Sequence, residues 1–296
     1  MTETAVNAVL RRDRAIVIAA ITAISVLAWA YTLWLAAQMS MMEIPATTAG
    51  SGGMAGMNMP GMTTSGASGT MSGANMGGIS AAAEPAFRSW STADFAFMFI
   101  MWAVMMVGMM TPSVAPMVLL YATVGRNAAA SGRPFAATGW FLAGYLSAWV
   151  AFSLVATSAQ WILTRLALLT PMMESASGIV GGVVLIAAGL YQWSPLKDTC
   201  LKQCQTPLGF LMNRCGFRSE PFGALRLGAE HGLYCVGCCW VLMALLFVGG
   251  VMNVLWIAGL AILVLVEKVV PTGRLIPRLA GAGMAAAGLF FLFRAF

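Results

Sequence analysis

The sequence predicts an all-α protein, a polytopic bundle of transmembrane helices. Hydrophobic residues make up 60% of the 296 residues and charged residues only 9%, whereas about a quarter of a typical soluble domain is charged. The mean hydropathy is +0.84. Apolar stretches recur whose length approaches the roughly 20 helical residues that cross a bilayer core. Because a backbone in lipid must satisfy its own polar groups, these stretches are expected to be helices.

Seven stretches carry this prediction: residues 15–37, 95–123, 135–157, 176–193, 232–249, 254–266 and 279–293. Six helices is the alternative, because the sixth stretch is short and the last one also suits a tilted or re-entrant element. We therefore expect about seven membrane helices.

The basic residues predict the orientation, because Lys and Arg concentrate in cytoplasmic loops. With the N-terminus in the cytoplasm, 13 of the 16 basic residues lie on the inner side, and only Arg88, Arg165 and Arg294 lie outside. The net charge of +6 then reflects topology and contact with membrane lipid. Nucleic acid is not an expected partner.

Composition divides the chain into three regions. Residues 1–38 are expected to form an N-terminal anchor helix, since their apolar stretch exceeds the roughly 7 to 15 residues of a signal peptide. Residues 39–89 form an external loop rich in Met, Gly and Ser, which cannot bury enough apolar surface to order itself. Residues 90–296 form the bundle, with a Cys-containing inner loop at 194–229 that holds a short helix around Lys197–Cys204.

The external loop carries closely spaced thioethers at Met54, Met57, Met59 and Met62. A thioether needs no deprotonation and is a soft ligand, which favours Cu(I). The loop therefore predicts copper capture outside the membrane. The alternative is a low-complexity linker.

A second group of methionines lies in the second apolar stretch. Helical spacing places four on one face, two at its border and one farther on: Met98, Met101, Met105 and Met109, then Met106 and Met110, then Met117. Methionine sulfurs one helical turn apart could pass Cu(I) along the helix by ligand exchange. The alternative is that these methionines are flexible packing residues. Pro112 and Pro116 free backbone carbonyls there, which predicts the wall of an internal cavity.

The fifth stretch opens with a stripe of four candidate ligands. His231, Cys235, Cys238 and Cys239 stand at i, i+4, i+7 and i+8, so they share one helical face. Cys200 and Cys204, four residues apart, are candidates to complete this site. A structural His and cysteines that pack as small hydrophobes are the alternative. The cysteines face a reducing cytosol, which favours free thiols or metal ligands over disulfides. Glu267 and Lys268 are expected to pair with each other at the inner interface.

Three motifs carry a family resemblance: Met105-Met106-x-x-Met109-Met110-x-Pro112-x-x-x-Pro116-Met117, Tyr191-Gln192-x-x-Pro195-Leu196-Lys197-x-x-Cys200-x-x-x-Cys204, and His231-Gly232-x-x-Cys235-x-Gly237-Cys238-Cys239-Trp240, which continues through Met252-Asn253 to Glu267-Lys268. Over residues 90–270 they resemble domain-of-unknown-function family 2182, a bacterial group of predicted metal-binding integral membrane proteins. The resemblance implies a multi-pass protein of the inner membrane that binds metal, with no established reaction. A Met-rich ectodomain above a Met-x-x-x-Met helix is also similar to parts of the eukaryotic Ctr copper importers.

The leading hypothesis is a Cu(I)-handling protein that captures copper on external methionines and passes it to the inner Cys/His stripe, for transport or delivery. Other soft metals are compatible with the same ligands. The sequence has no ATP-binding motif, so copper would move down a gradient of affinity. The alternatives are a membrane metalloenzyme or redox protein, disfavoured by the single His, and an assembly factor. A cuproenzyme or a copper chaperone is then the expected protein partner.

Overall fold

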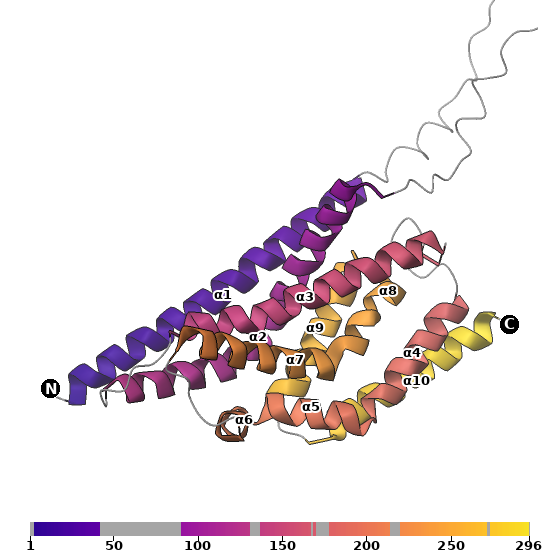
Figure 1. The fold of residues 1–296 in the computed structure, drawn as a ribbon. Coiled ribbons are helices and arrows are strands. Elements are labelled where there is room, and N and C mark those ends of the chain that lie inside the picture. The colour runs from indigo at the N-terminus through magenta and orange to yellow at the C-terminus, as the bar shows by residue number, and fades with distance from the viewer. Residues whose placement is uncertain are drawn as a thin grey trace, which may run out of the picture.

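The computed structural model describes residues 3–41, 90–130, 137–166, 168–169, 178–213, 220–270 and 273–295. The elements in these ranges are helices, which confirms the all-α class (Figure 1). In chain order they are α1 (Glu3–Met41), α2 (Thr92–Ala130), α3 (Thr138–Arg165), α4 (Gly178–Gln192), α5 (Pro195–Gln205), α6 (Pro207–Asn213), α7 (Pro221–Ala244), α8 (Leu246–Gly249), α9 (Val254–Val269) and α10 (Leu275–Ala295). Met54, Met57, Met59 and Met62 lie outside the described residues.

Five helical segments are long and apolar enough to cross a membrane: Ala15–Gln38, Thr92–Asn127, Thr138–Arg165, Pro221–Gly249 and Leu275–Ala295. A sixth arises if α4 and α5, which meet at a bend of 63°, count as one broken span. Helix α9 has only 16 residues. Within the described ranges, length and composition therefore support five or six spans. They do not confirm the expected seven or the cytoplasmic N-terminus.

Local sequence sets the start of the helices that carry the candidate site. At α2, Ser91 and Asp94 form a capping box, in which the Ser91 N–H donates to Asp94 Oδ2 at 2.9 Å and the Asp94 N–H donates to Ser91 Oγ at 3.2 Å. At α5, the Ser194 hydroxyl accepts from the Lys197 N–H, and Pro195 occupies the first turn. A new helix therefore begins directly after α4, which produces the bend.

The inner loop expected at residues 194–229 is largely helical. It contains α5, α6 and the first turns of α7, which begins at Pro221 instead of Gly232. The short helix predicted around Lys197–Cys204 lies inside α5. A capping serine and prolines at the first positions of α5, α6 and α7 supply start signals that hydropathy does not register.

Helices α1 and α2 form one side of the molecule and α4 and α10 the other, with α3, α7 and α9 between them (Figure 1). Glycines allow close backbone contact between α3 and α7 and between α4 and α10. A Cβ atom on Gly144 of α3 would lie 1.9 Å from the Leu225 carbonyl oxygen of α7, and one on Gly189 of α4 would lie 2.6 Å from the Gly281 carbonyl oxygen of α10. Small residues allow such close approach in membrane helices. The α3–α7 contact fixes the geometry of the candidate site.

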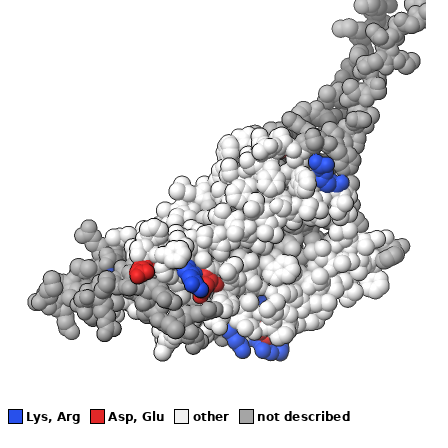
Figure 2. Space-filling view, viewed as in Figure 1, with Lys and Arg blue, Asp and Glu red and all other residues white. Residues whose placement is uncertain are grey.

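Charged groups occupy little of the face shown in Figure 2, where they gather mainly toward the end that holds α5, α6 and the start of α7. One basic group lies apart from them, toward the opposite end, and most of the rest of the face is uncharged. Exposed apolar side chains such as Leu27, Val155 and Leu255, between 64% and 85% accessible, fit contact with lipid.

Candidate metal centre

The predicted stripe on α7 is buried in the bundle. His231, Cys235, Cys238 and Cys239 are each no more than 3% exposed. Spacing of three and four residues turns these side chains toward the core instead of toward lipid. Periodicity therefore identified a buried face correctly.

Cys235 has the densest set of polar contacts in this stripe. Its Sγ accepts a hydrogen bond from Lys268 Nζ at 2.7 Å and lies 3.0 Å from the Tyr145 hydroxyl. Its backbone carbonyl accepts from the thiols of Cys238 and Cys239, at 3.0 and 2.9 Å. Cys235 thus links α7 to α3 and α9.

The same two polar side chains also reach α2. Lys268 Nζ lies 4.0 Å from Met110 Sδ and donates to Ser113 Oγ at 3.2 Å. The Tyr145 hydroxyl lies 3.2 Å from the Met110 carbonyl oxygen, to which it can donate. We call Met110, Tyr145, Cys235 and Lys268 the sulfur junction. It joins the methionines of α2 to the cysteines of α7.

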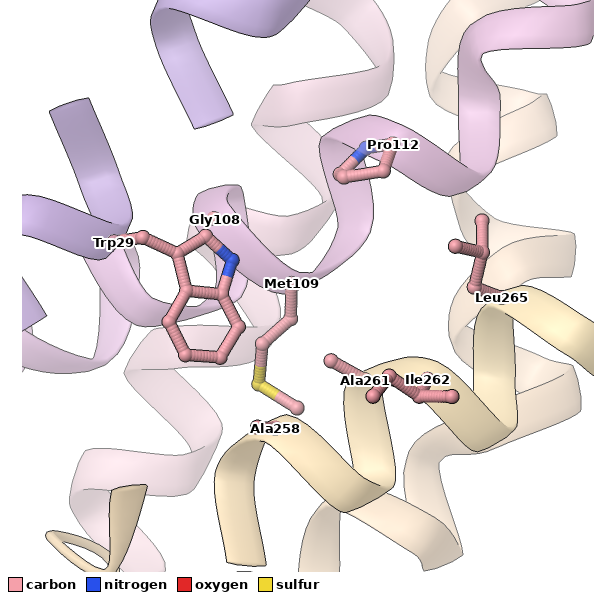
Figure 3. Close-up of a pocket in the computed structure, with 8 residues that line it drawn as sticks. All are labelled: Trp29, Gly108, Met109, Pro112, Ala258, Ala261, Ile262 and Leu265. Atoms are coloured by element: carbon pink, nitrogen blue, oxygen red, sulfur yellow. The ribbon is translucent and has the colours of Figure 1, made fainter. Parts of the chain in front are cut away.

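The methionines of α2 do not all face this junction. Six are buried, and Met98 is partly buried with its sulfur 3.8 Å from Gln160 Nε2; the six are Met101, Met105, Met106, Met109, Met110 and Met117. Met109 instead lines a cavity of about 200 Å³ between α1, α2 and α9, where it points toward Ala258 (Figure 3). Pro112 lines the same cavity, whereas Pro116, also expected at a cavity wall, is exposed and is not part of its lining. Met110, expected at the border of the methionine face, is the residue that reaches Lys268.

His231 lies one turn before Cys235, with an unused ring nitrogen. Its side chain is 3% exposed, and its ring lies 4.9 to 6.1 Å from the rings of Phe141, Tyr145 and Phe210. Its buried Nδ1 has no hydrogen-bond partner among the described residues. A buried nitrogen without a partner costs free energy, so this atom is a candidate ligand.

The cysteines of α5 join the α7 stripe. The Cys204 thiol interacts with those of Cys235 and Cys238. Cys200 Sγ packs so closely on Gly237 that a Cβ there would lie 2.9 Å away. Cys200 also lines a surface groove of about 360 Å³ with Glu230, Leu233 and Tyr234. Cys200 and Cys204 therefore lie between the buried stripe and the surface.

A buried polar network holds α5 in this position. Lys197, fully buried, donates to Gln192 and forms an ion pair with Glu267 Oε2 at 2.6 Å. Gln192 Nε2 donates to the second Glu267 oxygen at 3.1 Å. The expected pairing of Glu267 with Lys268 is therefore wrong. Adjacent helical side chains point about 100° apart, so Glu267 faces α4 and α5 while Lys268 faces Cys235.

Comparison with known proteins assigns the sequence of this chain to a family. A family model described as PpoB2, copper chaperone, matches residues 99–291. The chain belongs to this copper chaperone family. The matched range contains the sulfur junction, the α7 stripe and the cysteines of α5, and it excludes α1 and the Met-rich residues 39–89. It supports copper handling but not the family 2182 name. Neither a curated protein nor a solved structure matches the chain.

The chemistry of the donor set fits copper as the cargo of a copper chaperone family. Thiol and thioether sulfur are soft ligands, and the unpartnered Nδ1 of His231 is a borderline one. Among the described residues, however, no group of three or more His, Cys, Asp or Glu side chains is arranged to hold a metal ion. In this structure the thiols of Cys238 and Cys239 donate hydrogen bonds to the backbone carbonyl of Cys235. The ammonium of Lys268 contacts both Cys235 Sγ and Met110 Sδ.

Sequence reasoning missed two residues of the site, Ser113 and Tyr145, and expected Lys268 only to pair with Glu267. Their contacts span 33 to 158 positions of the chain, and no local period reports such distances. One signal was available for Lys268, because an ionisable side chain within an apolar membrane helix is a functional candidate by default.

Proposed function

We propose that this chain is a membrane copper chaperone that accepts Cu(I) outside the bilayer and delivers it inside to a partner protein. The external methionines, Met54, Met57, Met59 and Met62, collect the ion. Methionines of α2 carry it to the sulfur junction, and the cysteines of α7 and α5 receive it. The observation that carries this proposal is that Lys268 and Tyr145 each contact both Met110 and Cys235.

The order of ligands supports this direction. Thioethers bind without losing a proton, and thiolates bind soft metals more strongly, so affinity rises from α2 to α7. Sulfur ligands along the route keep the ion coordinated, which avoids the cost of a bare charge in low dielectric. The route ends at Cys200, beside a groove on the surface. With the N-terminus in the cytoplasm of a bacterium, that groove opens at the inner face.

Delivery to a protein is favoured over an enzyme because the family is described as a copper chaperone. The acceptor class is a cuproenzyme or a second copper chaperone. Cys200, partly exposed at the groove, is the proposed point of transfer.

The test uses the full chain in proteoliposomes that contain a trapped Cu(I) chelator. Externally added Cu(I) should reach the chelator with wild-type protein and at least about tenfold more slowly with Cys235→Ser. Cys204→Ser should slow release while Cu(I) still binds. Equal rates in empty vesicles, wild type and Cys235→Ser would contradict transmembrane delivery.

A further inference from the structure

The ammonium of Lys268 is the one cation shown at the sulfur junction in the described part of the chain, and ligand exchange does not by itself require it. Its side chain is 7% exposed and contacts Cys235 Sγ, Ser113 Oγ and Met110 Sδ at 2.7, 3.2 and 4.0 Å. The neighbouring carboxylate, Glu267, is bound by Lys197 instead. A positive charge is thus built into the point where a metal ion would pass from thioether to thiol.

We infer that Lys268 determines which ionic charge the junction accepts, and selects a monovalent over a divalent cation. This inference rests on the proposed function and adds the specificity of its site. A thiolate presents a negative charge that attracts a divalent ion more strongly than a monovalent one. The ammonium 2.7 Å from Cys235 offsets that charge, so the preference for higher charge disappears while the softness of sulfur remains.

Sulfur ligands alone do not supply this selection, because cysteine thiolates also bind divalent Zn²⁺ tightly. Several such thiols lie close to the junction, since Cys204 interacts with Cys235 and Cys238. Each extra unit of charge placed about 5 Å from the ammonium, at an effective dielectric constant of about 20, lowers affinity by a factor on the order of 100. A divalent ion carries one more unit of charge than Cu(I), so the ammonium lowers its affinity by this factor relative to that of Cu(I).

Two soft probe ions separate charge from softness: Ag(I) and Cd(II). Their affinities for the anaerobically purified full chain are measured by competition with chelators. Lys268→Leu should raise the ratio of Cd(II) to Ag(I) affinity about 100-fold. Lys268→Gln, which keeps a donor for Cys235 without the charge, should raise it similarly, and Lys268→Arg should hold it near the wild-type value. The matched control is Lys202→Leu, at an exposed position of α5.

Unchanged ratios in Lys268→Gln and Lys268→Leu, with Ag(I) still bound, would overturn the role of Lys268 and leave the proposed function intact. An equal rise in Lys202→Leu would also overturn the role of Lys268, because the effect would then belong to the net charge of the protein. Absence of Ag(I) binding by the wild type would overturn the proposed function and this inference together. Should Lys268→Leu fail to fold, Lys268→Gln gives the same comparison.

Discussion

The hydroxyl of Tyr145 lies 3.0 Å from the Sγ of Cys235, across the interface of α3 and α7. The same hydroxyl lies 3.2 Å from the carbonyl oxygen of Met110. One side chain therefore registers three helices against each other at the junction of the methionine and cysteine groups. That registration depends on how closely α3 approaches α7.

Gly144, adjacent to Tyr145, makes this approach possible, and its replacement should be costly. Gly144→Ala would put a Cβ 1.9 Å from the Leu225 carbonyl oxygen, so we expect a loss of about 3 kcal/mol in stability. Thermal unfolding in detergent measures it. Gly139→Ala is the matched control on the same helix, because nothing lies within 4 Å of its Cβ position. A control change above about 1 kcal/mol would refute the steric explanation.

The ion pair of Lys197 and Glu267 should hold α5 against the bundle. Removing either partner leaves a buried charge, so Lys197→Met or Glu267→Gln should each destabilise the protein by about 3 to 5 kcal/mol. The double variant Lys197→Met with Glu267→Gln should recover most of that loss, because no buried charge remains. Unfolding measurements on the three variants form a double-mutant cycle. Additive losses would show that the pair is not coupled.

Met110 and Met109 offer a matched pair for the route of copper. Met110→Leu removes the thioether 4.0 Å from Lys268, so Cu(I) transfer into proteoliposomes should slow by about tenfold or more. Met109→Leu makes the same chemical change beside the α1–α2–α9 cavity and should slow transfer less than threefold, as a rough bound. A larger effect at Met109 would place the route along that cavity instead of through the junction.

His231 should contribute to binding at some expense of stability. His231→Leu has similar volume and removes the unpartnered Nδ1, so the thermal stability of the metal-free protein should rise by about 1 kcal/mol. Cu(I) affinity should fall about tenfold. Unchanged affinity together with reduced stability would assign His231 to packing alone.

Sequence periodicity was sufficient to predict the burial of the α7 stripe and of most α2 methionines, because in each case the fixed helical repeat determines which side chains share a face. It could not choose between Met109 and Met110, since that choice depends on where α9 crosses α2. Hydropathy placed the core of the spans but overlooked that α7 begins at Pro221, where the first turns are less apolar. Neither periodicity nor hydropathy could predict the partners of Lys268 and Glu267, because contacts between helices distant in the sequence determine them. Copper capture by the external methionines and the orientation of the chain in the membrane stay predictions.

The most direct test is Cu(I) affinity of the anaerobically purified protein, measured by chelator competition for the wild type, Cys235→Ser and Cys200→Ser. Cys235 lies at the centre of the buried contacts, whereas Cys200 lies at the groove. Affinity should fall about 100-fold or more for Cys235→Ser and less than about tenfold for Cys200→Ser. A wild-type protein that binds no Cu(I), or a Cys235→Ser variant that binds it equally well, would contradict the account.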